Sequence, residues 1–348
     1  MLTFDASELS RLDSYIRNAG QVSIVVHTHP DGDAIGSAVA LRSYLMHRTG
    51  AQVMIVVPDR CPQNLSFLFD EKALIVTSDR PEDSSRWISG SDLIFCLDIN
   101  AFDRTGMVEQ SLRASVCAKV LVDHHLHPAV QDFDVVFSTA EVSSTCELLF
   151  WVLLSVSGGC GAADLPSECA YALMTGMTTD TNNFANSVFP STFEMSSKLI
   201  DAGVDRDDIL VHLYNEYREN RFRAMGAFLQ EKLKITDDGV AYAVFRTEDW
   251  LRYDLMEGET EGFVNLPLGI NKVRMSIFLR EENGLFRVSI RSKKGWSANL
   301  LAAEYFNGGG HECASGGRLR YPEDIPDSSA AEKYIERVTA RFLHEKES

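Results

Sequence analysis

Short apolar runs alternate with longer amphipathic stretches along the first two-thirds of the chain. Four of the runs consist almost entirely of aliphatic residues, which is typical of parallel strands that are buried on both faces. They cover residues 22–26, 53–57, 93–97 and 120–122. Between the first two lies the stretch 34–48, which has the composition of a helix that stops near Gly50. This order of strands and helices predicts a doubly wound α/β domain with a mostly parallel sheet.

Two more helices are predicted from a serine that is followed three residues later by a glutamate. In such a capping box the serine hydroxyl accepts a hydrogen bond from the amide of the third residue, and the glutamate bonds back to the serine amide. The first box begins at Ser144, and its helix is expected to continue through the apolar segment 148–154 to Gly158 and Gly159. The second box begins at Ser191.

The pattern changes after residue 204. Residues 205–235 are highly charged at helical spacing, and we interpret them as a helical linker. Beyond them, the segments 240–246 and 274–292 alternate apolar and polar residues in steps of two, which predicts strands. The pair Asn283-Gly284 favours a tight hairpin turn within the second segment.

Two helices complete this second region. One is expected to follow Ser297, and the other to begin near Ser328. Together with the hairpin they predict a smaller α+β domain. The expected organisation is an N-terminal α/β domain over residues 1–204, a linker over 205–235 and the α+β domain over 236–348.

Composition narrows the classes of partner. The chain is 45% apolar and 24% charged, as in soluble globular proteins, and its net charge of −17 argues against binding long duplex nucleic acid. The charged N-terminus lacks the apolar core of a signal peptide, and the longest apolar run, 148–154, is too short for a bilayer. Seven cysteines, an odd number without a C-x-x-C pair, indicate reduced thiols. We therefore expect a cytoplasmic protein without a membrane partner.

Metal-capable side chains follow the predicted strands at the points where these strands end. They are His27, Asp31, Asp33, Asp98, Asp123, His124 and His125, with Asp180 after a later helical stretch. A single aspartate at a strand end is more often a helix cap or a turn residue. The same residue types recur at several strand ends, however, and the carboxyl ends of parallel strands meet at one edge of the sheet. We therefore expect these side chains to converge.

The chemistry of this set favours two metal ions. Imidazole combined with carboxylate suits a divalent transition metal. The carboxylates are too numerous for one ion, and unpaired neighbours would raise each other's pKa. Two dications roughly 3.5–4 Å apart remove that repulsion and suit phosphoryl transfer, because together they activate water and stabilise charge on the phosphoryl oxygens.

The ordered motifs of the chain resemble those of the DHH phosphoesterase superfamily and span nearly its whole length. In order, they are H-x-x-P-D-x-D-A-x-G-S from His27, CLDIN around Asp98, the triplet Asp123-His124-His125, GMTTDTNNF around Asp180, and GGGHECASGG from Gly308. The last of these resembles the signature of the accessory DHHA1 domain. One departure is that Asn182-Asn183 follows the fourth motif's D-T, where many relatives have glycine. A substrate contact from that loop is therefore in question.

The resemblance implies roles for the strand-end residues. One ion would be bound by His27, Asp31 and Asp98, and the other by Asp33, Asp98, His124 and Asp180, with Asp98 bridging. Asp123 would support these ligands, and His125 would contact the scissile phosphate. The implied cofactors are two divalent ions, usually Mn²⁺ in this family, with Mg²⁺ and Co²⁺ as alternatives.

The compact two-domain form is similar to the nano-RNase type of this superfamily. That similarity implies an Mn²⁺-dependent phosphoesterase that uses metal-activated water on short oligoribonucleotides and on adenosine 3′,5′-bisphosphate (pAp). Alternatives are an inorganic pyrophosphatase or exopolyphosphatase, a phosphodiesterase for dinucleotides derived from cyclic dinucleotides, and a non-catalytic nucleotide-binding regulator. The implied partners are short RNA and small nucleotides, and a homodimer remains open.

The second domain carries candidate substrate contacts. Residues 272–294 hold seven basic and two acidic side chains, which we interpret as an anion clamp, with a solvated hairpin face as the alternative. The glycines after the helix predicted from Ser297 could end that helix or let the backbone approach a ligand closely. The candidates for substrate binding are Arg291, Ser292, Lys293, Gly309, Gly310 and His311.

Overall fold

The structure is a computed structural model that describes residues 2–156 and 161–347. It consists of two units, Met1–Glu216 and Tyr217–Ser348. The boundary falls inside the segment predicted as a helical linker. That segment contributes α8 (Arg206–Tyr214) to the first unit and α9 (Glu219–Ala227) to the second.

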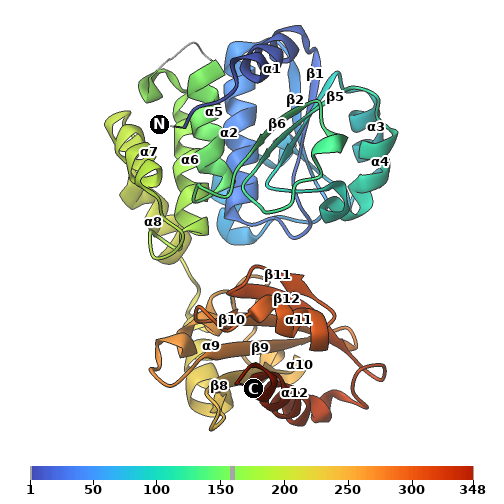
Figure 1. The fold of residues 1–348 in the computed structure, drawn as a ribbon, viewed down its shortest axis with the longest axis vertical. Helices are drawn as coiled ribbons and strands as arrows, with labels where there is room; N and C mark the ends of the chain where they lie inside the picture. Colours follow the sequence, from blue (N-terminus) through green and yellow to red (C-terminus); the bar gives the residue numbers. More distant parts are fainter. Residues whose placement is uncertain (1, 157–160, 348) are drawn as a thin grey trace. The chain divides into compact units, whose positions relative to one another are not determined.

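The first unit is built on a sheet of six parallel strands in the order β3-β2-β1-β4-β5-β6 (Figure 1). The strands are β1 (Gln21–Val25), β2 (Gln52–Val57), β3 (Leu74–Val76), β4 (Leu93–Leu97), β5 (Ala118–Asp123) and β6 (Val135–Ser138). The predicted doubly wound, mostly parallel sheet is thus confirmed. Strands β3 and β6 lie at the two edges and have three and four residues, too few to show a period in the sequence.

Helices cover both faces of this sheet. They are α1 (Ala6–Asn18), α2 (Gly32–Arg48), α3 (Pro81–Ser89), α4 (Glu109–Ala114), α5 (Thr145–Val156), α6 (Ser167–Asp180) and α7 (Pro190–Asp201). Side chains such as Ile24 point from the strands into a core formed with α1, α2, α5 and α6. The next residue, Val25, points into the opposite core, which contains Ile88 of α3 and Leu112 of α4. Burial on both faces explains why the central strands are almost purely aliphatic.

The predicted start of α5 is correct. The helix begins at Thr145, and the Ser144 hydroxyl accepts the Glu147 amide at 3.0 Å. The Glu147 carboxylate accepts the amide of Ser143 at 2.9 Å, so the box is displaced by one residue on its return bond. The predicted end at Gly158 and Gly159 lies outside the described residues.

The start of α7 predicted from Ser191 is wrong by two residues, because a capping box at Ser191 places the first helical residue at Thr192. The helix begins at Pro190, whose fixed φ and missing N–H suit the first helical position. The hydroxyl that meets the helix N-terminus belongs to Thr192, which accepts the Phe189 amide at 3.0 Å.

The second unit contains a mixed sheet in the order β11-β12-β10-β9-β8-β7. Its strands are β7 (Lys234–Ile235), β8 (Val240–Phe245), β9 (Met275–Glu282), β10 (Leu285–Ser292), β11 (Gly309–Gly310) and β12 (Ala314–Arg320). The hairpin between β9 and β10 turns at Asn283 and Gly284, whose φ angles of 47° and 83° fit the predicted tight turn.

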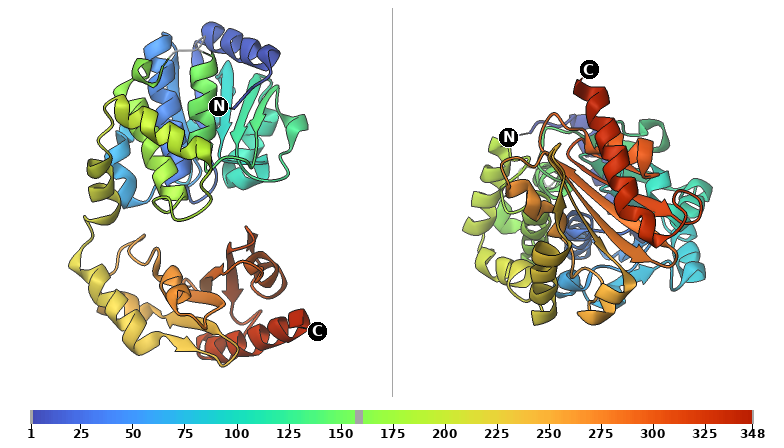
Figure 2. Two further views of the ribbon diagram at one scale, coloured as in Figure 1. Left: turned by 60° about the vertical axis from the view of Figure 1, so that its left-hand side comes forward. Right: turned by 90° about the horizontal axis from the view of Figure 1, so that it is seen from below.

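Helices α10 (Thr247–Arg252), α11 (Ala298–Tyr305) and α12 (Ala331–Glu347) accompany this sheet (Figure 2). Helices α11 and α12 pack on one face, where Leu301 and Ile335 meet side chains from the strands. The other face is filled by a cluster of aromatic rings that includes Phe228, Phe245 and Phe278. The predicted smaller α+β unit is therefore confirmed.

Candidate metal centre

The candidate site lies at the switch point of the parallel sheet. Strand β1 lies between β2 and β4, so the chain leaves β1 toward one side and later returns to β4 on the other. In sheets with this topology, ligands bind beyond the carboxyl ends of the strands at such a point. His27 and Asp31 follow β1, and Asp98 follows β4.

The structure brings the predicted metal-binding side chains together. In each of three groups, the ligand atoms lie within 4.8 Å of one another. The groups are His27, Asp31 and Asp98; Asp33, His124 and Asp180; and Asp98, His124 and His125. The first group is the first set implied by the family resemblance, and the second group contains three members of the second set, all except Asp98. The ligand roles themselves stay a prediction.

Asp98 joins the two groups. Its Oδ2 lies 3.3 Å from Nε2 of His27, and its Oδ1 lies 3.6 Å from Nε2 of His124. Its φ of 58° places a buried residue other than glycine in the left-handed region. Strain of this kind persists where the surroundings over-determine the conformation, as functional sites do. The distances show that each oxygen of Asp98 faces a different histidine. A carboxylate that bridges two ions needs this arrangement.

The orientation of His27 suits a metal ligand. Its Nδ1 lies 2.8 Å from the carbonyl oxygen of Thr28, which can only accept a hydrogen bond. Nδ1 therefore carries a proton, and Nε2 faces the carboxylates of Asp31 and Asp98, at 3.7 and 3.3 Å. Fixing one ring nitrogen by a backbone bond is the usual way to orient a metal-binding imidazole.

Asp31 and Asp33 each lie at a helix N-terminus. Asp31 caps α2 by accepting the amides of Asp33 and Ala34, both at 3.1 Å. Asp33 is buried and accepts the amides of Thr145 and Cys146, at 2.7 and 2.9 Å, at the start of α5. The positive end of α5 therefore stabilises the ionised form of Asp33, and the bonds fix both of its oxygens.

The electrostatics show that the cluster needs positive charge. Burial and the neighbouring charge of Asp98 raise the pKa of Asp33 well above its usual value. Burial and the charge of Asp33 do the same to the pKa of Asp180. Burial also disfavours the ionised form of Asp98, but its contact with His27 outweighs this effect and lowers the pKa of Asp98. The carboxylates outnumber the cations available to them, so this donor set fits divalent metal ions.

The two remaining candidates, Asp123 and His125, form a pair beside Asp98, whose Oδ1 lies 3.6 Å from Nδ1 of His125. Nδ1 of His125 lies 2.7 Å from Oδ1 of the fully buried Asp123. Burial lowers the pKa of His125, but this bond more than compensates, and the net pKa is raised. The contact of Nδ1 with Asp123 therefore fixes the orientation of the His125 ring.

Two residues near the cluster were not among the predicted candidates. The Thr145 hydroxyl donates to Oδ1 of Asp98 at 3.0 Å. The exposed Arg104 lies close enough to His125 for its charge to oppose the raised pKa of that imidazole, and its carbonyl accepts the Thr28 amide at 2.8 Å. The capping pattern at Ser144 could have indicated Thr145, because side chains in the first turn of a helix point toward the groups that lie beyond its N-terminus. No sequence pattern marks Arg104, which lies in the 3₁₀ segment Phe102–Val108.

The substrate candidates of the second unit lie on neighbouring strands. Arg291 of β10 is opposite Ala314 of β12, and Gly310 of β11 is opposite Ser315 of β12. Burial lowers the pKa of Arg291, and its guanidinium donates to the carbonyl of Ile290 at 3.0 Å.

The other substrate candidates of this unit differ in their exposure and in their hydrogen bonds to the protein. The Ser292 hydroxyl is buried and donates to the Glu312 carbonyl at 3.4 Å. The Lys293 ammonium donates to the carbonyls of Ile270 and Asn271, both at 3.1 Å. His311 is exposed, and its amide donates to the Ala314 carbonyl at 2.8 Å.

The glycines in this region differ in how closely other atoms approach them. A Cβ on Gly308 would lie 2.0 Å from the carbonyl oxygen of Gly316, and one on Gly310 would lie 2.7 Å from that of Ala314. Close packing of the hairpin therefore explains these two glycines. Gly309 is exposed, with no atom within 4 Å of its Cβ position, so space for a ligand remains there.

The basic segment 272–294 is partly neutralised. Arg280 pairs with Glu257 at 3.0 Å and Glu282 at 2.8 Å, and Arg287 pairs with Glu257 at 3.4 Å. These pairs support the alternative of a solvated hairpin face for that part of the segment. Arg291, the arginine singled out from the sequence as an anion contact, is in none of these pairs, and its guanidinium donates to backbone carbonyls.

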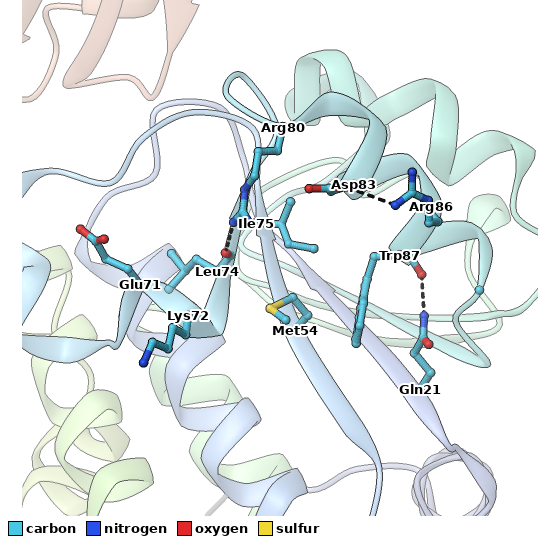
Figure 3. Close-up of a pocket in the computed structure, with 11 residues that line it drawn as sticks. Gln21, Met54, Glu71, Lys72, Leu74, Ile75, Arg80, Asp83, Arg86 and Trp87 are labelled. Atoms are coloured by element: carbon cyan, nitrogen blue, oxygen red, sulfur yellow. Dashed lines mark hydrogen bonds and ion pairs between the residues drawn. The ribbon is translucent and has the colours of Figure 1, made fainter.

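A hollow of about 790 Å³ lies elsewhere in the first unit, beside β2, β3 and α3 (Figure 3). Several of its polar side chains bond to other residues of its lining. Arg80 donates to the carbonyl of Leu74 at 2.8 Å, Arg86 pairs with Asp83 at 3.3 Å, and the amide of Gln21 donates to a backbone carbonyl. None of the three metal-capable groups lies in it, so this hollow is not the candidate site.

Comparison with known families decides the assignment. The model of the DHH family, N-terminal domain, matches residues 21–177, and the DHHA1 domain matches residues 237–337. An exopolyphosphatase-related protein from Bacteroides fragilis has a crystal structure that aligns over 100% of both chains, with 34% identity and a TM-score of 0.91. The chain belongs to the DHH family. Its DHHA1 domain coincides with the second unit.

Two curated relatives cover most of this DHH protein. It is 25% identical over 328 residues to the bifunctional oligoribonuclease and PAP phosphatase NrnA of Bacillus subtilis, covering 89% of this chain and 93% of the relative. It is 28% identical over 323 residues to the protein of the same name from Thermus thermophilus, covering 92% and 89%. These matches support an NrnA-like member of the family.

Two further observations concern location. Within residues 2–156 and 161–347, no helix of this DHH protein is long and apolar enough to cross a membrane. The six cysteines of the described residues are free thiols. The cytoplasmic location stays a prediction.

Proposed function

We propose that this protein is a two-metal phosphoesterase that hydrolyses short oligoribonucleotides and pAp. Membership of the DHH family supports phosphoesterase chemistry on nucleotides. The observation that carries the proposal is the position of Asp98, whose two oxygens face His27 and His124 at 3.3 and 3.6 Å. That arrangement suits two neighbouring cations that share one carboxylate. Such a pair of ions can stabilise both the attacking and the leaving oxygen in an in-line displacement at phosphorus.

The side chains divide the work. One ion would be held by His27, Asp31 and Asp98, and the other by Asp33, Asp98, His124 and Asp180. The bound ions, Mn²⁺ in our proposal, would supply an activated water and positive charge at the phosphate. Burial lowers the pKa of His124, which favours the neutral imidazole that ligates metal.

Two further side chains would act on the phosphate itself. Nε2 of His125 would donate a hydrogen bond to a phosphate oxygen, since the contact of Nδ1 with Asp123 orients the ring and favours its charged form. The permanently charged guanidinium of Arg104 would add a second contact to the same phosphate. Asp123 is a positioning residue, since it acts through His125.

The second unit would contribute to substrate binding. We assign an anion contact to Arg291 and close approach of the substrate to the backbone of Gly309 and Gly310, beside His311. Ser292 and Lys293 would support this region through their bonds to backbone carbonyls. A guanidinium can grip a terminal phosphate with two parallel hydrogen bonds, which suits a short strand end or pAp.

Polyphosphate or pyrophosphate hydrolysis is the second candidate function. The structural relative with 34% identity carries the name exopolyphosphatase-related. The same metal cluster would serve that reaction. Nucleotides are favoured because two curated relatives named for oligoribonuclease and PAP phosphatase activity match about nine-tenths of this chain. A non-catalytic regulator is disfavoured because all six residues predicted as ligands are present and belong to groups that could hold a metal ion.

The test is a substrate panel with purified protein and Mn²⁺. The panel contains a ribodinucleotide, a longer RNA, pAp, pyrophosphate, and the linear dinucleotide derived from a cyclic dinucleotide. We expect turnover of the ribodinucleotide and pAp, and loss of that turnover with a chelator or in Asp98→Asn. Hydrolysis of pyrophosphate alone would favour the second candidate, and nucleotide binding without turnover would favour a regulator.

A second variant tests the phosphate contact of Arg104. Arg104→Gln should raise KM for the ribodinucleotide on the order of tenfold, the loss expected for one charge-assisted hydrogen bond. Mn²⁺ affinity should be unchanged. The matched control is Arg113→Gln, which removes an exposed arginine that pairs with Glu109 at 2.8 Å. Unchanged kinetics in Arg104→Gln would remove this residue from the mechanism.

A further inference from the structure

The chain takes an unusual turn directly after the metal-binding candidate Asp180. Three successive residues other than glycine, Asn182, Asn183 and Phe184, have φ angles of 47°, 57° and 66°. The Asn183 amide donates to the Thr178 carbonyl at 2.8 Å, which closes the turn onto α6. Left-handed residues of this type are rare, and three in a row are retained only where their surroundings enforce them. The turn fixes the direction in which Phe184 points.

Phe184 forms a stacked pair with Phe193 of α7. The ring centroids are 5.4 Å apart and the planes are inclined by 15°. Phe193 is 54% exposed, so much of this large aromatic side chain is open to solvent. The Arg206 guanidinium lies 5.5 Å from the Phe184 centroid and also bonds the Asn183 side chain. A cation therefore accompanies the aromatic pair.

Two short connections tie this pair to the metal cluster. Phe184 follows Asp180 by four residues, so their Cα atoms are at most about 15 Å apart. On the other side, the hydroxyl of Thr192, the residue before Phe193, donates to Glu147 of α5 at 2.7 Å. The same helix begins with Thr145, which bonds Asp98. Both rings are thus anchored to elements that carry the cluster.

We propose that the stacked pair Phe184–Phe193 binds a nucleobase of the substrate while a phosphate of that substrate lies at the metal cluster. This inference rests on the proposed function and narrows its substrate to molecules with a base. Exposed aromatic faces take up bases by stacking without regard to sequence, and an adjacent guanidinium adds cation–π attraction and a phosphate contact. The pair also accounts for the asparagines of the fourth motif. They form a rigid turn that presents Phe184.

The experiment compares a base-bearing substrate with one that lacks the base. The substrates are the ribodinucleotide ApA and two abasic analogues, one without each base, all with the same phosphodiester. We expect Phe193→Ala to raise KM for ApA at least fivefold with little change in kcat. Phe193→Trp keeps an aromatic ring and should have a KM for ApA near that of the wild type. One of the abasic analogues should respond to neither variant. The control is Phe222→Ala, which removes a similarly exposed ring, at 56%, from α9.

A binding measurement makes the inference independent of turnover. A non-hydrolysable phosphonate dinucleotide that carries 2-aminopurine should lose fluorescence when its base stacks on the wild-type protein, and should lose much less with Phe193→Ala. Unchanged binding in Phe193→Ala, or an equal loss on ApA and both abasic analogues, would overturn the inference. Failure of the proposed function would be recognised differently, by a wild-type protein that binds the analogue but does not hydrolyse ApA.

Discussion

At the scale of single residues, the proposed metal site depends on groups that are not themselves proposed as ligands. The first turn of α5 supplies the Thr145 and Cys146 amides to Asp33 and the Thr145 hydroxyl to Asp98. Thr145 therefore orients two carboxylates of the cluster, one through its amide and one through its hydroxyl. Partners of this kind set the direction of the ligand lone pairs, and their loss weakens metal binding although the ligands remain.

We expect Thr145→Val to lower Mn²⁺ affinity on the order of 10- to 100-fold, because it removes the hydroxyl with almost no change in shape. Thr145→Ser should restore the affinity. Calorimetric titration with Mn²⁺ measures both. The control is Thr339→Val, which removes another buried hydroxyl, bonded to the Ile335 carbonyl at 2.7 Å in α12. Wild-type affinity in Thr145→Val would show that the hydroxyl does not position Asp98.

At the scale of elements, the second unit holds its last helix to the sheet by polar contacts one turn apart. Glu332 of α12 accepts two hydrogen bonds from Nη2 of Arg246, which follows β8, at 2.9 and 2.8 Å. Glu336, one turn further, accepts the hydroxyl of Tyr242. Partial burial alone would raise the pKa of Glu332, but the bond to Arg246 prevails and lowers it.

This pair makes a stability difference that depends on pH. A carboxylate whose pKa is lower in the folded than in the unfolded protein stabilises the fold above its unfolded pKa, near 4.3, and the effect is lost as the pH falls through the folded value. Glu332→Gln should therefore lower the free energy of unfolding at pH 7 by up to about 1 kcal/mol. The difference from wild type should shrink as the pH falls below about 4.

Urea unfolding of the wild type and Glu332→Gln at pH 7 and at low pH measures this difference. Glu323→Gln on the surface is the control, and it should show no such dependence. A deficit in Glu332→Gln that persists unchanged at low pH would assign the effect to the helix itself and not to the ion pair.

At the scale of the whole molecule, the sequence predicts the architecture well because buried strands have a recognisable local pattern of apolar residues. The aliphatic runs mark the four longest strands of the parallel sheet, and the two-residue alternation with Asn283-Gly284 marks the hairpin of the second unit. The edge strands β3 and β6 are too short to show such a pattern. The start of α7 at Pro190 is fixed by backbone geometry that a serine-based pattern does not describe.

The site is predictable to the extent that topology determines it. Because parallel strands end at one edge, the order of elements is enough to expect His27, Asp98 and His124 to meet. The supporting contacts are not predictable in this way. The bond from Thr145 to Asp98 joins residues 47 positions apart, and the stacking of Phe184 on Phe193 depends on three left-handed residues that the sequence does not announce.

Electron paramagnetic resonance of the Mn²⁺-loaded protein tests the proposal that Asp98 bridges two metal ions. Two ions roughly 3.5–4 Å apart that share a carboxylate are magnetically coupled. We predict two Mn²⁺ per chain with a coupled spectrum in the wild type, and loss of the coupling in Asp98→Ala. A wild-type spectrum of isolated Mn²⁺, with one ion per chain or two uncoupled ions, would contradict the account.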